Sequence, residues 1–424
     1  MRKLLFLAAV WLSLPAAAHA FCGFYVARAD GELYNQASKV VYVRDGRRTV
    51  ITMSSDYRGE PSDFALIVPT PRVLGEDDIR TVMAETVDHL DAYSAPRLVE
   101  YFDFDPCHPQ MVFEDSVLGQ LNARNSEAEY RRDAAALGVQ IKGEYAIGTY
   151  DVLILKAAQS DGLVTFLTTE GYQLPDGAER VLGDYIRGGM KFFVARVNLD
   201  RHEAAATRDL PPLQISFNSR NFMLPIQLGK LNADGAQDAL IMMLTRKGRV
   251  EVANYNETVL PTDTNIPTFV EDMFPSFYRS MFNKAVGDNG GIALEYGWDM
   301  GWCDPCAADP LSRKELEELG VDWLQGDGNG GQNVYVTRFH AQYTKDQMPE
   351  DLMFRESSNR GNFQGRYVMN RPFTGRITCE HGREYIKDTR LRLRREALNL
   401  ADITGWSPRR IEKRIRDSVP KSYW

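Results

Sequence analysis

The chain has 424 residues, of which 44% are hydrophobic, and a formal net charge of −8 at pH 7. This length and composition supply enough apolar material for one large core or two medium ones. The acidic balance argues against general nucleic-acid binding, which needs a basic surface to displace the counterions of the phosphates.

Residues 1–20 have the pattern of an export signal. Arg2 and Lys3 precede an apolar run from Leu4 to Leu14, and Ala18-His19-Ala20 is a small-x-small cleavage site. The run is about 11 residues long, whereas roughly 20 are needed to span a bilayer. We therefore expect a soluble mature protein that begins at Phe21 and is periplasmic or secreted.

The first predicted elements are a hairpin, a short strand and a helix. Lys39–Arg44 and Arg48–Ser54 alternate in polarity around Asp45-Gly46, a typical hairpin turn. Phe64–Val68 is a short apolar run that ends at a proline, and Glu76–Tyr93 has apolar residues at helical spacing.

The rest of the chain contains both predicted strands and predicted helices, and the two do not alternate regularly. Strands are predicted at 145–156, 190–199, 213–217, 239–245, 250–254 and 333–343, and helices within 161–187 and at 267–286. This pattern predicts an α+β fold with mixed, mainly antiparallel sheets, packed helices and a helical C-terminal region. We place an α+β domain at 21–265, a second α+β region at 266–405 and a basic helix or tail at 406–424.

Four stretches resemble, in order, one bacterial protein family. They are Phe21–Val26, His89–Tyr101, Trp302–Leu311 and Pro349–Phe354. The chain is similar over Phe21 to about Trp406 to the family called domain of unknown function 2330 (DUF2330). The resemblance implies an exported bacterial protein without an assigned activity, and it supplies no catalytic residue.

All five cysteines lie in the mature chain, at positions 22, 107, 303, 306 and 379. In an oxidising compartment thiols usually pair, and an odd count leaves at least one unpaired. We prefer the pairs Cys22–Cys107 and Cys303–Cys306 with Cys379 free. A bond between Cys306 and Cys379 is the rival scheme.

The pentapeptide Trp302-Cys303-Asp304-Pro305-Cys306 also resembles a thioredoxin active site. There, Cys303 would be the attacking thiolate and Cys306 the resolving thiol, with Trp302 and Pro305 shaping the site. Such a thiolate needs a helix N-terminus, but the capping box of Ser312 and Glu315 starts the next helix later. A structural disulfide is therefore our preferred interpretation, and a thiol-disulfide oxidoreductase is the alternative.

A zinc site is the third possibility for these thiols. Cys303 and Cys306 could bind the metal together with Cys379 and His381, although a second pair at metal-binding spacing is missing. We commit to no metal site and expect no cofactor. A group of acids and imidazoles could also form a cation or acid/base site, but we prefer to explain it as an exposed helix face followed by a loop. The group consists of Asp88, His89, Asp91, Asp103, Asp105 and His108.

The C-terminal region is basic, with eleven Lys or Arg against five Asp or Glu between Arg383 and Arg416. Ile386, Leu393 and Leu400 form an apolar stripe, which favours a helix packed on the acidic body. The alternative is contact with an anionic partner or lipid surface through four arginines: Arg390, Arg392, Arg394 and Arg395. Since common catalytic signatures are absent from the sequence, we favour a disulfide-stabilised binding or envelope-assembly module over an enzyme.

Overall fold

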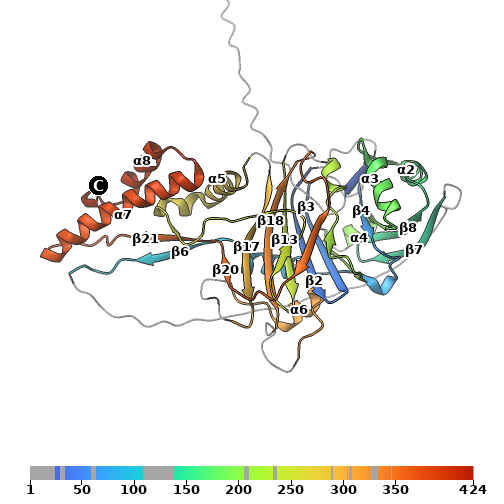
Figure 1. Cartoon of the computed structure of the whole chain (residues 1–424), viewed down its shortest axis with the longest axis horizontal. Coiled ribbons are helices and arrows are strands. Elements are labelled where there is room, and N and C mark those ends of the chain that lie inside the picture. Colours follow the sequence, from blue (N-terminus) through green and yellow to red (C-terminus); the bar gives the residue numbers. More distant parts are fainter. Residues whose placement is uncertain are drawn as a thin grey trace, which may run out of the picture.

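The computed structural model describes residues 24–28, 34–58, 64–107, 138–204, 210–232, 236–287, 290–302, 304, 308–325, 333–344 and 346–423. Figure 1 shows an elongated body with sheets in its middle and helices at both ends, the C-terminal helices forming one of these ends. The predicted α+β class, with mainly antiparallel sheets and a helical C-terminal region, is confirmed.

The central sheet has nine strands, in the order β15-β17-β18-β13-β2-β3-β11-β5 with β20 paired to β17. Only its β2–β13 and β15–β17 pairs are parallel. Strands on both sides of the expected boundary after residue 265 pair within this sheet. The strands are β2 (Tyr34–Asp45), β3 (Arg48–Arg58), β5 (Ile79–Thr81), β11 (Leu213–Asn218), β13 (Gln237–Thr245), β15 (Glu257–Thr258), β17 (Gly291–Asp299), β18 (Tyr335–Tyr343) and β20 (Phe363–Gln364).

The predicted hairpin of β2 and β3 is confirmed, and its pattern explains why the sheet is buried on both faces. Gly46 makes the tight turn at φ 58°, a conformation that glycine adopts without strain. Val40 and Tyr42 point into one apolar core, whereas Val41 and Val43 point into another. Successive side chains of a strand face opposite sides, so both faces of this sheet need an apolar cover.

One face is covered by a six-stranded sheet in the order β7-β8-β10-β4-β1-β9. Leu66, Val152 and Phe193 of this sheet face the central sheet, while Ile67 and Phe192 pack beneath α2 and α3. Its elements are β1 (Phe24–Arg28), β4 (Phe64–Thr70), β7 (Val139–Ile147), β8 (Tyr150–Ala157), β9 (Tyr172–Gln173), β10 (Lys191–Val197), α2 (Ser160–Thr169), α3 (Ala178–Arg187) and the short α4 (Leu199–Ala204).

The other face of the central sheet is covered by α1 (Ala84–Ser94) and α6 (Arg313–Leu319). The long helix expected over Glu76–Tyr93 is wrong in its first half. Residues Ile79–Thr81 form β5 and pair with β11, because this pairing satisfies their main chain in an extended form. The strand expected over 145–156 is likewise two strands, β7 and β8, with a turn at Gly148.

The C-terminal helices cover a separate three-stranded sheet, β16-β21-β6 (Figure 1). Leu393 and Leu400 of α7 are buried there against Tyr367 and Met369, so the predicted packing of the apolar stripe is confirmed. The elements are β6 (Arg97–Phe102), β16 (Thr264–Asn265), β21 (Arg366–Arg371), the 3-10 helix η5 (Thr268–Met273), α5 (Phe274–Val286), α7 (Glu380–Thr404) and α8 (Pro408–Ser418).

A small sheet, β12 (Met223–Leu224), β19 (Leu352–Glu356) and β14 (Val250–Val252), completes the strands. Among the helices of the described residues, none combines the length and the apolar character needed to cross a membrane.

Candidate functional site

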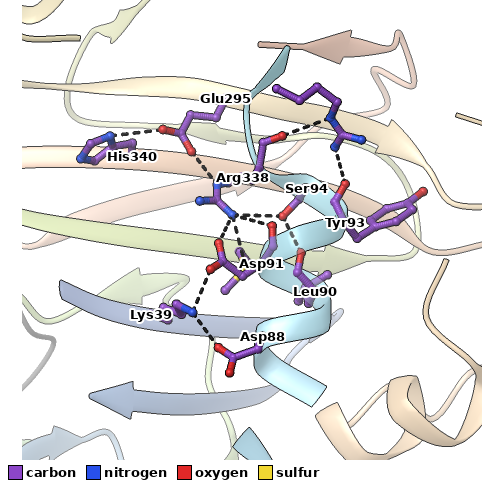
Figure 2. Close-up of polar contacts among 12 residues, drawn as sticks. Lys39, Asp88, Leu90, Asp91, Tyr93, Ser94, Glu295, Arg338 and His340 are labelled. Atoms are coloured by element: carbon purple, nitrogen blue, oxygen red, sulfur yellow. Dashed lines mark hydrogen bonds and ion pairs between the residues drawn. The ribbon is translucent and has the colours of Figure 1, made fainter. Parts of the chain in front are cut away.

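A buried cluster of charged side chains lies where α1 meets the central sheet (Figure 2). Arg338 on β18 is 4% exposed and Glu295 on β17 is 1% exposed. Arg338 donates through Nε to Glu295 Oε2 at 2.5 Å and through Nη1 to Asp91 Oδ1 at 2.5 Å. A buried guanidinium needs such carboxylates to offset its desolvation, so these bonds hold α1 to β17 and β18.

The cluster extends toward the surface through Lys39 on β2. Its Nζ lies 2.7 Å from Asp88 Oδ1 and 2.8 Å from Asp91 Oδ2. Arg97, at the start of β6, donates to the carbonyl oxygen of Tyr93 at 2.6 Å and so caps the end of α1. Asp88 and Asp91 of α1 therefore bind the sheet through Lys39, and of these two acids only Asp88 is mainly exposed, as the interpretation of an exposed helix face required.

On the other side of Glu295 lies His340, whose two ring nitrogens both face carboxylates. Nε2 is 3.0 Å from Asp238 Oδ1, and Nδ1 is 3.2 Å from Glu295 Oε1. Burial lowers the pKa of His340, but Asp238 and Glu295 outweigh this effect and raise it to about 9. Burial raises the pKa of Glu295, but Arg338 and His340 outweigh it and lower it to about 2.

We call Arg338, Glu295, Asp91, His340 and Lys39 the α1 network. Each of its charged groups faces an opposite charge. A general acid or base needs a pKa near the working pH, whereas here the cationic and anionic forms are strongly favoured. The α1 network thus holds α1 against the central sheet.

A polar cleft of about 390 Å³ lies at the C-terminal end of α6, and we call it the α6 cleft. It lies between the strands β3, β5 and β11, the 3-10 helix η2 (Glu76–Asp78) and the end of α6. Its polar and charged lining residues are Arg48, Asp77, Asp78, Arg80, Gln214, Ser216, Glu317 and Asp322. Small-molecule sites have volumes of roughly 300–1,000 Å³, so the α6 cleft is large enough for one.

A second surface is exposed at the end of β6. Tyr101, Phe102 and Phe104 are 52%, 64% and 59% exposed, although aromatic rings are usually covered. The guanidinium of Arg371 on β21 lies 5.9 Å from the ring centre of Phe102. We call these three residues, together with the edge of β6 that pairs with no strand among the described residues, the β6 surface.

A disulfide joins Cys107, just after β6, to Cys379 at the N-terminal end of α7. The predicted pairing of Cys107 with Cys22 and the prediction of a free Cys379 are therefore wrong, as is the rival Cys306–Cys379 bond. The two cysteines are 272 residues apart in the sequence, and parallel pairing of β6 with β21 brings their Cα atoms to 5.7 Å. Cys22 lies outside the described residues.

The pentapeptide at 302–306 is described only in part, because Cys303, Pro305 and Cys306 lie outside the described residues. Trp302 is 69% exposed. Asp304 accepts hydrogen bonds from Tyr296 Oη at 3.0 Å and Gln364 Nε2 at 2.6 Å. The next helix, α6, begins at Arg313 with Ser312 as its cap, as the capping box predicted.

The metal candidates do not come together in the described part of the chain. Cys379 cannot bind a metal as a thiolate because its sulfur is in the disulfide. It therefore drops out of the candidate zinc ligands, which included His381. The acids and the imidazole of the group at 88–105 separate as well: His89 faces Glu315 at 2.7 Å, while Asp103 pairs with Arg392. His108 lies outside the described residues. Across the described residues, no three His, Cys, Asp or Glu side chains form a group able to hold a metal.

The four arginines considered for an anionic surface have different surroundings. Arg392 is bound to both carboxylate oxygens of Asp103, at 3.0 and 2.6 Å, and Arg390 donates to the carbonyl of Ser422. Arg394 and Arg395 are exposed. Arg392 is therefore part of the contact between α7 and the end of β6.

Sequence reasoning missed the α1 network and the α6 cleft. A signal for the first was present, since Arg338 and His340 are polar residues on one face of an otherwise apolar strand. Their partners come from four other elements, so spacing along the chain could not identify them.

Comparison with known proteins gives one match. The model of the family DUF2330, described as an uncharacterized protein conserved in bacteria, matches residues 15–355. The matched region ends before β21, α7 and Cys379, earlier than the resemblance up to Trp406 suggested. No curated protein and no solved structure matches the chain.

Proposed function

Since the chain belongs to the DUF2330 family, whose description gives no activity, we propose a binding function from the geometry. The protein is an exported, disulfide-stabilised envelope protein that binds an extended segment of another protein along the β6 surface. The observation that carries this proposal is a strand edge with three exposed aromatic rings, anchored at its end by a disulfide.

The main chain of β6 supports an extended occupant. Arg97 N donates to Gly365 O at 3.0 Å and Asp103 N to Arg371 O at 2.9 Å, both on the side of β21. Because main-chain groups alternate along a strand, those of Leu98, Glu100 and Phe102 face the other edge. Among the described residues no strand pairs with that edge, so an added strand would form hydrogen bonds with these main-chain groups.

The end of β6 is held in place, which lowers the entropy lost on binding. The Cys107–Cys379 bond and the Asp103–Arg392 pair attach it to α7. Tyr101 and Phe102 are neighbours and point to opposite faces, so a bound strand would contact an aromatic ring on each side.

Export is supported by the leader pattern of residues 1–20 and by the disulfide. Disulfides persist in oxidising compartments such as the periplasm and are rare in the cytosol. We therefore place the binding function in the periplasm or outside the cell.

The test is selection of a phage-displayed library of random peptides on the oxidised mature protein. We expect enriched peptides with alternating apolar residues, and slower amide hydrogen exchange at Leu98, Glu100 and Phe102 when they bind. The double variant Tyr101→Ser and Phe104→Ser should lose binding. The matched control, Leu391→Ser and Leu398→Ser, removes two exposed side chains of α7 and should bind normally.

Two results would count against the proposal. One is a selection that enriches no peptide, or that enriches peptides which bind the double variant of Tyr101 and Phe104 (the β6 variant) as tightly as they bind the parent protein. The other is self-association in sedimentation that the β6 variant abolishes, because the occupant would then be a second copy of the chain.

A further inference from the structure

The α6 cleft is independent of the β6 surface and is large enough for a small molecule. Its two cations, Arg48 and Arg80, are fixed by the C-terminal end of α6. Arg48 donates through Nη1 to Gly320 O at 2.7 Å and pairs through Nε with Asp322 at 3.1 Å. Arg80 donates through Nη2 to Glu318 O at 2.7 Å.

A buried amide forms the support of Arg80. Gln214 on β11 is 2% exposed and accepts from Arg80 Nε at 2.6 Å. It donates in turn to Thr52 Oγ1 at 2.8 Å and to Glu318 O at 3.0 Å. This support restricts the rotation of the guanidinium, so binding a ligand there would cost little side-chain entropy.

Both guanidinium groups keep hydrogen-bond donors for a ligand. A guanidinium has five N–H donors, and the described partners take only some of them. Burial lowers the pKa of Arg80, Glu318 opposes this, and Arg48 lowers it further. An anionic group placed between the two arginines would relieve their mutual repulsion and accept their free N–H groups.

A simple anion does not complement the rest of the α6 cleft. Four carboxylates, those of Asp77, Asp78, Glu317 and Asp322, also line it. Asp322 pairs with Arg48 and Asp78 with Arg72, but Asp77 is exposed and has no ion pair among the described residues. A ligand that carries both signs of charge would satisfy the arginines and Asp77 together.

We propose that the α6 cleft binds a small zwitterion with a carboxylate and an ammonium group, of the amino-acid class. The carboxylate accepts from Arg48 and Arg80, and the ammonium group faces Asp77. The volume of about 390 Å³ limits the ligand to a small molecule.

The test is saturation-transfer NMR of the oxidised mature protein with pooled free amino acids, followed by calorimetric titration of those that bind. Acetate serves as the anion-only probe and methylammonium as the cation-only probe. We expect an amino acid to bind and neither single-charge probe to compete at equal concentration. Asp77→Asn should weaken binding by about tenfold, because a charge-assisted hydrogen bond is lost.

The matched control is Glu76→Gln, which neutralises the neighbouring exposed acid of η2 outside the cleft lining and should leave affinity unchanged. Arg80→Gln should abolish binding, but it can also loosen α6, so Asp77→Asn is the decisive variant. Absence of binding by every amino acid, equal competition by acetate, or equal effects of Asp77→Asn and Glu76→Gln would overturn the proposal.

Discussion

A single arginine, Arg338, joins three elements that are far apart in the sequence. It binds Glu295 on the neighbouring strand and Asp91 on α1 at the same time. Removing one partner of such a buried set leaves the others as uncompensated charges, which is more harmful than losing a surface ion pair. The residue therefore contributes to stability in a way that its place in a strand pattern does not reveal.

We expect Arg338→Met to lower the free energy of unfolding by about 3–5 kcal/mol, because Glu295 would stay buried without its cation. Urea denaturation followed by circular dichroism measures this loss. The control Arg355→Met removes a mainly exposed partner of Glu251 and should cost less than about 1 kcal/mol. Similar losses in the two variants would contradict the role of the α1 network.

Unlike Arg338, whose buried charge is paired, Glu396 on α7 is buried without a hydrogen bond from the described residues to either carboxylate oxygen. Nε of Arg392 lies 3.6 Å from its Oε1. Burial raises its pKa to about 7, with Arg392 opposing and Asp103 adding to the shift. The folded state therefore binds a proton that the unfolded state has released between pH 4.5 and 7.

Because folding raises the pKa of Glu396, its contribution to the free energy of unfolding falls as pH rises from about 4.5 to about 7 and is constant above that range. We expect Glu396→Gln to raise the free energy of unfolding at pH 8, by roughly 3 kcal/mol at most, and to have little effect at pH 4. Denaturation curves at both pH values measure the difference. A variant that is equally affected at pH 4 and pH 8 would refute the ionisation argument.

At the scale of elements, α7 depends on contacts with segments distant in the sequence. Its apolar stripe covers β21, its arginine at 392 binds Asp103, and its first turn follows the disulfide at Cys379. These contacts connect the helical end of the molecule to β6. The shape of the β6 surface is thus decided by α7 as much as by β6 itself.

Replacing Cys107 and Cys379 by serine should lower the free energy of unfolding by about 2–5 kcal/mol, because a long loop in the unfolded chain is no longer closed. The loss should be accompanied by faster hydrogen exchange in Glu380–Thr404 while β13 keeps its protection. Cys22→Ser is the matched control and should change neither quantity. Unchanged exchange in α7 would show that the disulfide is not what holds the helix.

For the whole molecule, export and cysteine chemistry are linked. If the leader is removed, the mature chain starts at Phe21 and retains all five cysteines. With Cys107–Cys379 formed and Cys303–Cys306 predicted to pair, one thiol, that of Cys22, remains.

We expect mass spectrometry of periplasmic protein to find Phe21 as the first residue, and maleimide to label one thiol after unfolding without reductant. The Cys303–Cys306 bond should have a reduction potential below about −300 mV, as structural disulfides have. A potential near that of thioredoxin, about −270 mV or higher, would favour the oxidoreductase alternative instead. An intact leader would contradict export.

Much of the local structure could be predicted because its causes are local. The Asp45-Gly46 hairpin, the Ser312 cap of α6 and the apolar stripe of α7 each follow from a few neighbouring residues. The helix expected over Glu76–Tyr93 was wrong at Ile79–Thr81, where pairing with β11 overrides helical spacing. The α6 cleft could not be predicted, since β3, η2, β11 and α6 contribute to it.

By itself the sequence determined the α+β class, the family resemblance and the expectation of export, because composition, motifs and periodicity carry this information. The tertiary structure alone decided that Cys107 bonds to Cys379 and that Arg338 meets both Asp91 and Glu295. Such contacts depend on which distant strands pair, and the parallel register of β6 with β21 is what brings Cys107 to α7. Pairing of this kind is an energetic property of the whole chain, so no local pattern encodes it.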